Sequence, residues 1–222
     1  MLRFCPSVLL VDKCPLEWVG GNGYFTAGAH RTAHAGLADL ITLLRNPPNP
    51  EQASKIDITP YTCDDFRSDV MRLSKGKSDS ALVDVVVNDS RGAIEWLAKK
   101  VGVPFCLSFN RQAYEVGGRQ KFWGGVALSV ENGGKGLIEA HQRALAKAGV
   151  ISWFETPVTS IIMQDGAVCG VRLLKDGNAM EVKARNVILA AGGFEANAEL
   201  RALYLGRGWE KAKVVTISSA SP

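Results

Sequence analysis

The sequence lacks both the long apolar run and the block of like charge that would indicate a membrane or a nucleic acid. No stretch reaches the roughly 18 apolar residues of a membrane-spanning helix. The chain has 26 Lys and Arg against 22 Asp and Glu, a formal net charge of +4, and its basic residues are scattered. Scattered charge of this size does not argue for nucleic acid. We therefore expect neither a membrane span nor a nucleic-acid partner.

The cysteines follow no disulfide or zinc pattern. There are five, an odd number, and no pair has the CxxC spacing of a zinc or redox site. They are Cys5, Cys14, Cys63, Cys106 and Cys169. We expect reduced, mostly buried thiols, no bound metal and a cytoplasmic location. The apolar start of the chain is interrupted by Pro6 and closed by Asp12, which favours a buried strand over a signal peptide.

What the chain does have is the composition of a globular protein, with 46% hydrophobic and 22% charged residues among 222. Residues 8–11 form a short apolar run that ends at Asp12, which is typical of a buried parallel strand. A similar run over residues 187–191 leads into Gly192-Gly193 and predicts a second buried strand.

Apolar spacing predicts the helices. Leu37, Leu40, Ile41 and Leu44 recur at helical spacing, so we expect a helix over residues 35–45. Further helices are expected over residues 63–75, 79–101 and 136–148, and from about residue 197.

Runs rich in β-branched residues predict strands over residues 150–154, 157–164, 167–174 and 179–184, and Asp-Gly pairs separate the last three. Residues 46–60, with four prolines, and residues 104–135, with three Gly-Gly pairs, are expected to be loops. The order of these elements predicts an α/β fold with a β-insertion.

Asp12 is the first candidate for binding chemistry. A carboxylate at the end of a strand in a dinucleotide-binding fold can accept both hydrogen bonds of a ribose diol, whereas the alternative is an acid that merely ends a strand. The turn Gly20-Gly21-Asn22-Gly23 follows. Its backbone can approach a pyrophosphate or a flat ring closely, because glycine has no Cβ. Each feature is weak alone, as is the small-residue end of the strand at Gly192-Gly193.

Taken together, these segments resemble the flavoprotein subunits of succinate dehydrogenases and fumarate reductases, and within that family the FAD-dependent tricarballylate dehydrogenase group. The resemblance rests on four segments: GGNGYFTAGAHRT from Gly20, RQAYEVGGRQKFWGGVAL from Arg111, ENGGKGLI from Glu131 and VILAAGGFEAN from Val187. It covers nearly the whole chain, in the family's order and spacing.

The resemblance implies a set of FAD contacts. Asp12 takes the position of a ribose-binding acid that is usually Glu. The turn at Gly20, Gly21, Asn22 and Gly23 surrounds the pyrophosphate and flavin, and Gly28 and Ala29 lie under the isoalloxazine. Val158 meets the adenine, and Ala191, Gly192 and Gly193 make the last contact. Because Asn22 stands where membrane-bound relatives attach FAD through histidine, the resemblance implies noncovalent FAD.

The same resemblance implies parts that this sequence does not contain. Only eleven residues precede Asp12, so the first strand and its GxGxxG turn are absent, because a complete βαβ unit takes about 30 residues. The family's capping domain, with its catalytic arginine, has no counterpart. We therefore expect an incomplete doubly wound, Rossmann-like FAD-binding domain with an antiparallel β-meander insertion over residues 1–217, a disordered tail over residues 218–222 and no assignable catalytic residue.

The implied activity is FAD-dependent dehydrogenation or reduction of a small polycarboxylate, such as tricarballylate, fumarate or succinate, with an electron acceptor that the sequence does not identify. Hydride leaves one carbon and a proton leaves its neighbour, and cations must hold the carboxylates. Arg31, Arg111, Arg119 and Lys121 are the available cations. A catalytically inactive fragment and a non-catalytic flavin-binding module are the alternatives.

The three histidines carry weaker hypotheses. His30 and His34 have i, i+4 spacing, but no third metal ligand lies nearby in the sequence. His30 either faces the substrate or is an ordinary packed side chain, and His141 is expected to be structural. Gly134-Lys135-Gly136 lacks the spacing of a phosphate loop and indicates a helix start that could favour an anion.

Overall fold

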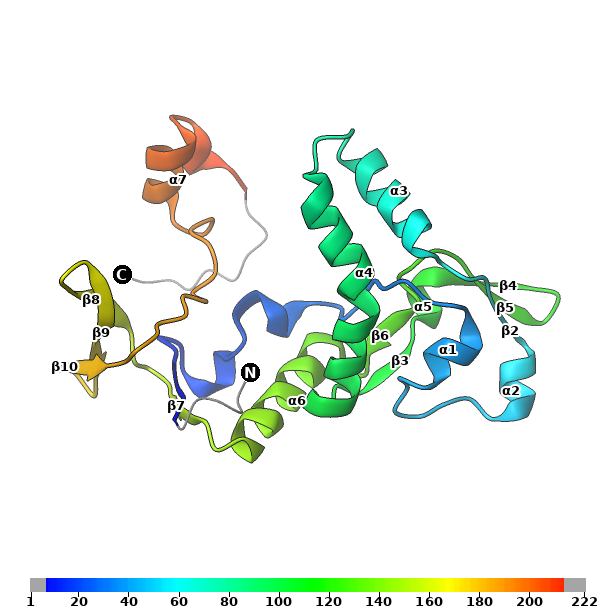
Figure 1. The fold of residues 1–222 in the computed structure, drawn as a ribbon, viewed down its shortest axis with the longest axis horizontal. Helices are drawn as coiled ribbons and strands as arrows, with labels where there is room; N and C mark the ends of the chain where they lie inside the picture. Colours follow the sequence, from blue (N-terminus) through cyan, green and yellow to red (C-terminus); the bar gives the residue numbers. More distant parts are fainter. Residues whose placement is uncertain (1–6, 214–222) are drawn as a thin grey trace. The chain divides into compact units, whose positions relative to one another are not determined.

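The computed structural model describes residues 7–213, which fall into two compact units (Figure 1). The terminal unit takes both ends of the chain, Met1–Tyr24 and Ala148–Pro222, and the middle unit is Phe25–Lys147. The predicted tail at residues 218–222 lies outside the described residues. Among residues 7–213, every helix is too short or too polar to traverse a lipid bilayer.

In the terminal unit, the first expected strand forms a parallel pair. β1 (Leu9–Val11) lies beside β7 (Ile151–Trp153), with Leu9 opposite Ile151. The predicted meander is also present: β8 (Val158–Gln164), β9 (Ala167–Lys175) and β10 (Asn178–Lys183) form an antiparallel sheet in the order β10-β9-β8. Asp165 and Asp176 have φ of 52° and 51°, the left-handed backbone of tight hairpin turns.

The second expected parallel strand, residues 187–191, does not form. The segment pairs with no strand among the described residues, and Ile188 and Leu189 are 85% and 71% exposed. An apolar run becomes a strand only where a neighbour accepts its backbone hydrogen bonds. β1 pairs with β7 alone, so the prediction of a buried strand here is wrong.

The expected helix near residue 197 is α7 (Ala198–Leu205), which Asn197 caps by accepting from the N–H of Leu200. Arg201 on this helix is buried, and its guanidinium donates to the carbonyls of Glu195, Trp209 and Glu210. The side chain therefore ties α7 to the segments before and after it, including the short 3-10 helix Trp209–Lys211.

The middle unit has one main apolar core. Its buried side chains come from α4 (Ser80–Trp96), α6 (Gly133–Lys147), β3 (Phe105–Leu107), β6 (Leu128–Val130) and the chain near α1 (Leu37–Ile41). Phe105, Leu40 and Leu128 are fully buried there. A π-helix, Leu97–Val101, continues α4 and ends at Gly102, whose φ of 80° only glycine adopts readily.

A second cluster packs α3 (Cys63–Leu73) on α4, two helices that lie side by side in Figure 1. Phe66, Val83 and Val87 are its buried members besides Tyr61. Thr62 and Asp65 form a capping box at the start of α3. This reciprocal pair satisfies helix N–H groups that would otherwise lack partners. The predicted helices over residues 63–75, 79–101 and 136–148 are thus confirmed.

Two segments predicted as loops contain regular structure. Residues 46–60 include α2 (Pro50–Ser54), which begins with a capping box between Asn49 and Gln52, and β2 (Ile56–Ile58). Residues 104–135 include β3, β6, the short α5 (Phe109–Gln112) and the hairpin of β4 (Ala113–Val116) and β5 (Arg119–Phe122). β2 pairs in parallel with β5. The expected helix over residues 35–45 shortens to α1.

Candidate functional site

Asp12 lies where β1 ends, next to the chain that enters β8. Its backbone N–H donates to Trp153 O at 2.9 Å, and its carbonyl accepts from Thr156 N at 2.9 Å. Its carboxylate accepts from the N–H of Cys14 at 2.9 Å. The structure therefore brings Asp12 to the segment that begins β8, two residues before Val158. The half-buried carboxylate is held at the strand end, the position that ribose recognition requires.

Gly20 precedes a 3-10 helix, Gly21–Phe25, that contains the rest of the turn and follows another 3-10 helix at Leu16–Trp18. Gly23 N donates to Gly20 O at 2.9 Å, and Gly20 and Gly21 have φ of 94° and 51°. A Cβ at Gly21 would meet nothing within 4 Å. The backbone here is open on the side where a side chain would stand, and Asn22 is exposed.

Residues 191–193 present a similarly open backbone. All three are exposed, Gly192 has φ of 77°, and a Cβ there would meet nothing within 4 Å. Gly193 differs, because a Cβ on it would collide with the carboxylate of Glu195. Small residues thus leave main chain accessible at this point even though the segment is not a strand.

Gly28 and Ala29 belong to the middle unit, where Gly28 is buried against the start of α6. Its carbonyl accepts from Val130 N at 3.0 Å and from Nδ1 of His30 at 2.9 Å. A Cβ at Gly28 would stand 3.0 Å from Gly133 Cα, and φ is 73°. Packing alone therefore explains the glycine at position 28, whereas Ala29 is exposed.

The start of α6 is less open to an anion than its sequence suggested. The N–H of Gly134 donates to Thr26 O at 2.7 Å, so the chain before Gly28 already occupies it. A Cβ on Gly136 would collide with the carbonyl of Glu131. The glycines of Gly134-Lys135-Gly136 allow close packing at this helix start.

The predicted contacts thus fall into two groups. Hydrogen bonds join Asp12 to Trp153 and to Thr156, two residues before Val158, in the terminal unit, which also holds Gly20–Gly23 and residues 191–193. Gly28 and Ala29 form the other group in the middle unit. That all of them line one groove stays a prediction. The open main chain at Gly21 and Gly192, with a carboxylate at a strand end, fits a dinucleotide that is held through backbone contacts.

The histidines have ordinary structural surroundings. His34 is buried, its ring lies 6.2 Å from that of Tyr61, and its Nδ1 accepts from Gly36 N at 3.2 Å. Burial lowers the pKa of His34 below its usual value. His30 meets Phe105 edge-on, and Nδ1 of His141 lies 2.9 Å from the carbonyl of Leu137 one helical turn earlier. No cluster of three potential metal ligands occurs among residues 7–213.

The cysteine predictions are partly borne out. Cys14, Cys63, Cys106 and Cys169 are free thiols, and each is half-buried rather than buried. Burial raises the pKa of the Cys106 thiol, which keeps it protonated. Cys5 lies outside the described residues.

A polar cluster that the sequence did not suggest surrounds Arg31, three residues after Gly28. Arg31 Nη1 donates to Tyr61 Oη at 2.8 Å and to Asp69 at 3.3 Å, and Tyr61 Oη donates to Asp69 at 2.9 Å. Arg72 also contacts Asp69, and its hydrogen bond is the main cause that lowers the pKa of this carboxyl. Separations of 30 and 38 residues along the chain left no local signal for the cluster.

The candidate cations differ in how firmly they are engaged. Arg119 pairs with Asp57 and donates to the carbonyl of Ser54, so its guanidinium is already occupied. Arg31 donates to Tyr61 and Asp69 through one nitrogen, Nη1, and its guanidinium lies 5.7 Å from the ring centroids of Tyr61 and Phe66. Arg31 thus uses one guanidinium nitrogen in hydrogen bonds, whereas Arg119 uses three.

Comparison with protein families shows that residues 44–213 match the FAD binding domain. The matched range includes Val158 and residues 191–193, while the predicted contacts from Asp12 to Ala29 precede it. Among curated proteins, the chain is 26% identical over 199 residues to the NADH:fumarate oxidoreductase of Klebsiella pneumoniae (strain 342), covering 89% of this chain and 19% of that protein. It is 32% identical over 135 residues to the urocanate reductase of Eggerthella lenta, covering 57% and 20%.

Solved structures share the fold. The open conformation of a flavocytochrome c3 fumarate reductase superposes with a TM-score of 0.61 at 22% identity, covering 89% of this chain and 31% of that one. The 3-ketosteroid delta1-dehydrogenase of Sterolibacterium denitrificans gives a TM-score of 0.64 at 15% identity, covering 89% and 45%. The chain thus spans about a fifth of the curated relatives described above and under half of these structures.

Proposed function

This chain belongs to the FAD binding domain family, and from that premise we propose that it forms the FAD-binding part of an oxidoreductase acting on a small polycarboxylate such as fumarate, succinate or tricarballylate. FAD is the cofactor of the family. The match over residues 44–213 is the observation that carries the proposal. The chemistry that FAD supplies when bound is hydride transfer.

The residues proposed to hold FAD act mainly through the backbone. Asp12 accepts hydrogen bonds from the ribose, and the start of β8 at Val158 lies against the adenine. The backbone of residues 20–23 faces the pyrophosphate and flavin, Gly28 and Ala29 lie beneath the ring, and residues 191–193 close the site. Asn22 has an amide instead of a nucleophilic imidazole, so FAD is held noncovalently.

A carboxylate substrate is favoured over a steroid by the names of two relatives and by the cation Arg31. Fumarate and urocanate, named in two relatives, are carboxylates. Arg31, two residues after Ala29 in the chain, is held by Tyr61 and Asp69, and a guanidinium binds a carboxylate through paired hydrogen bonds. In this proposal Arg31 orients the substrate's carboxylate, while Tyr61 and Asp69 restrict the arginine to one position.

Reconstitution tests the cofactor proposal directly. The purified chain, incubated with FAD and freed of excess by gel filtration, should retain flavin absorbance near one equivalent. Acid precipitation should release all of the flavin into the supernatant, because no covalent bond holds it. Absence of retained flavin would show that this chain does not bind FAD by itself, and yellow precipitate would contradict noncovalent attachment.

A matched pair of glycine variants tests the site. Gly192 and Gly177 have φ of 77° and 76°, and a Cβ on either would meet nothing within 4 Å. Gly192→Val and Gly177→Val therefore impose the same backbone strain, but only position 192 is proposed to face FAD. Titration should show FAD binding weakened about tenfold or more by Gly192→Val, roughly 1.4 kcal/mol, and unchanged by Gly177→Val. Equal effects would remove residue 192 from the site.

Turnover tests the substrate class. The FAD-loaded chain is assayed with a reduced dye and fumarate, and with an oxidised dye and succinate or tricarballylate. Turnover that Arg31→Gln reduces mainly through KM supports the proposal. FAD binding without turnover of any of these acids would instead support the second candidate, a non-catalytic flavin-binding module.

A further inference from the structure

A cavity in the middle unit is lined by none of the residues proposed to contact FAD. It has a volume of about 540 Å³, within the roughly 300–1,000 Å³ of small-molecule sites. It is lined by the loop after α1, by the end of the π-helix that follows α4 and by residue 143 of α6. Leu44, Val103 and Pro104 give it an apolar wall.

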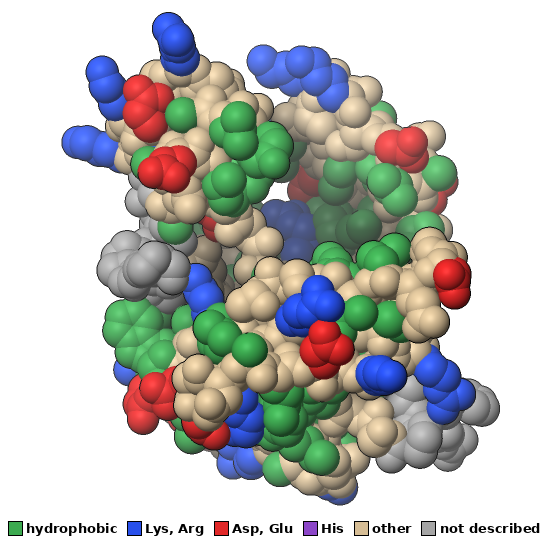
Figure 2. Space-filling model, turned by 90° about the vertical axis from the view of Figure 1, so that its left-hand side faces the viewer, with side chains coloured by type: hydrophobic (Ala, Val, Ile, Leu, Met, Phe, Trp, Pro, Cys, Tyr) green, Lys and Arg blue, Asp and Glu red, His purple; other side chains and the backbone are tan. Residues whose placement is uncertain are grey.

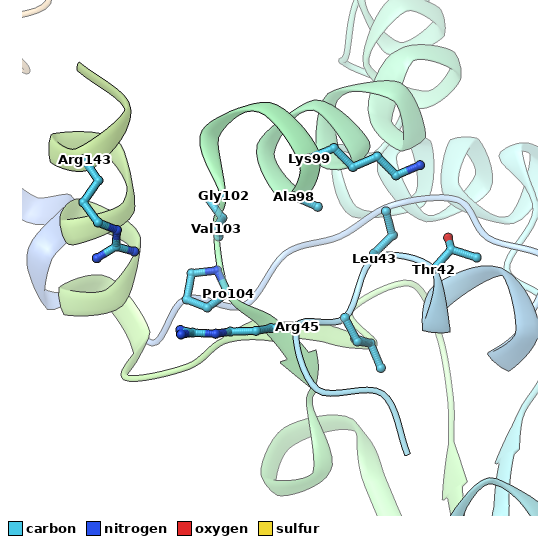
Figure 3. A pocket seen from close by; sticks show the side chains of 10 residues that line it. Thr42, Leu43, Arg45, Ala98, Lys99, Gly102, Val103, Pro104 and Arg143 are labelled. Atoms are coloured by element: carbon cyan, nitrogen blue, oxygen red, sulfur yellow. The ribbon is translucent and has the colours of Figure 1, made fainter. Parts of the chain in front are cut away.

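Two guanidinium groups reach into this cavity from different elements. Figure 3 shows Arg45, from the loop after α1, and Arg143, from α6, extending toward the same space in front of Pro104. Lys99, the third cation of the lining, extends away from that space and pairs with Glu95. The residues that line the cavity include these three cations and no carboxylate.

The carboxylates that flank the two arginines leave their donors available. Arg45 Nη1 lies 3.6 Å from Glu131, and Arg143 Nη1 lies 4.0 Å from Glu139. Both distances exceed those of hydrogen bonds, and both arginine side chains are about 60% exposed, at 62% and 60%. Exposed pairs of this length contribute little, so neither carboxylate needs to be displaced at much cost.

The helix end beside the cavity does not repel an anion strongly. The C-terminal carbonyls of a helix carry partial negative charge, but the carbonyl of Leu97 accepts from Gly102 N and Val103 N. The Leu97 carbonyl is therefore engaged in hydrogen bonds within the turn that ends the helix. The Leu97 carbonyl is thus not free to face an anion bound between Arg45 and Arg143.

We propose that this cavity is a binding site for a small organic anion, separate from the proposed FAD site. Arg45 and Arg143 bind its carboxylate or phosphate group from two sides, each through paired N–H donors. Leu44, Val103 and Pro104 contact its carbon skeleton. The site uses only residues of the middle unit, so it does not depend on the proposed oxidoreductase function.

Calorimetric titration of the full chain with citrate and, separately, with inorganic phosphate tests the proposal at constant ionic strength. Citrate offers carboxylates on a carbon skeleton, whereas phosphate offers the oxyanion alone. Tighter binding of citrate indicates a carboxylate ligand that uses the apolar wall, and tighter binding of phosphate indicates a phosphorylated one. Absence of binding by both overturns the proposal.

Variants locate the site. Arg45→Gln combined with Arg143→Gln should weaken binding of the tighter-binding anion about tenfold or more, because both guanidinium groups are lost. Lys55→Gln combined with Arg67→Gln removes two exposed cations of the same unit that pair elsewhere, with Glu51 and Asp84. This control removes the same charge and should change binding less than about twofold. Equal weakening by both pairs would mean nonspecific attraction and would overturn the site.

A measurement without mutation guards against misfolded variants. Phenylglyoxal modifies accessible arginines, and peptide mass spectrometry shows which ones the anion protects. Citrate or phosphate should protect Arg45 and Arg143 but not Arg67. Repeating the titration with the chain saturated with FAD separates the two sites: unchanged anion affinity supports a separate cavity, and competition would assign the anion to the flavin site.

Discussion

The two units differ in the interactions that stabilise each of them. In the middle unit, apolar side chains pack around Phe105, Leu40 and Leu128, whereas in the terminal unit Leu173 alone among the described apolar side chains is buried. The terminal unit relies on strand ladders and on the hydrogen bonds of Arg201. On the side of the molecule shown in Figure 2, hydrophobic side chains are exposed at the surface among charged ones.

This difference predicts which of the two units a bound ligand would stabilise more. Burial of apolar surface is the main favourable term in folding, and the middle unit has that term. Most of the proposed FAD contacts lie in the terminal unit, which has little of it. A ligand that binds only the folded state adds stability by mass action, and we expect that effect to fall on the terminal unit.

The largest expected contrast is between one buried and one exposed apolar residue. Phe105→Ala removes a fully buried ring from the middle unit and should lower the free energy of unfolding by about 3–5 kcal/mol. Ile188→Ala, at a side chain 85% exposed in the terminal unit, should change it by less than about 0.5 kcal/mol. Urea denaturation followed by circular dichroism measures both. A large loss with Ile188→Ala would mean that residue 188 is buried in solution.

The next contrast concerns hydrogen bonds in the terminal unit. Arg201→Met removes three charge-assisted bonds to main-chain carbonyls and should cost about 2–3 kcal/mol of local stability. The neighbouring exposed Arg207→Met is the control. Hydrogen exchange should become faster over residues 195–211 in Arg201→Met alone. Unchanged exchange would show that α7 does not depend on Arg201.

A pair of glycines in the middle unit should give effects of opposite sign. A Cβ at Gly125 would collide with the Tyr61 ring, whereas at Gly92, within α4, it would meet nothing within 4 Å. Gly125→Ala should destabilise by about 1–3 kcal/mol through overpacking. Gly92→Ala should stabilise by about 0.5–1 kcal/mol through helix propensity. Thermal and urea unfolding check the signs, and stabilisation by Gly125→Ala would contradict the contact with Tyr61.

The smallest effect is a pH dependence in the middle unit. Burial lowers the pKa of His34 in the folded chain, so below about pH 6.5, the usual pKa of histidine, the unfolded chain binds more protons. Stability should therefore fall as pH drops through this region. In His34→Gln this contribution is lost, and the free energy of unfolding should change less between pH 7 and pH 5. Identical slopes in both proteins would contradict the shift.

Local patterns predicted the elements that depend on local interactions. The long helices and the three-stranded meander follow from apolar spacing and Asp-Gly turns, and the structure confirms them. The capping box of Asn49 and Gln52 was also visible in the sequence, with Pro50 at the first helical position. Because residues 46–60 contain four prolines, however, they are predicted as a loop and this helix start is missed.

Elements that depend on distant partners could not be predicted in this way. β2 is a strand because Ile56 lies opposite Gln120 of β5, more than sixty residues away. Residues 187–191 have the composition of a buried strand, but no strand within residues 7–213 pairs with them. For the site, the sequence indicated Asp12 and Gly21 through residue type, but the contacts of Arg31 with Tyr61 and Asp69 depend on how β- and α-segments meet.

The parallel pairing of β1 with β7 sets an order of events during synthesis. Leu9 and Ile151 are 142 positions apart, and at about 5–20 residues per second the first strand waits roughly 7–28 s for its partner to leave the ribosome. All of Phe25–Lys147 emerges in that interval. If the middle unit folds as it appears, it brings the two strands near each other and reduces the entropy lost in closing so long a loop. The terminal unit is then the last part of the chain to assemble.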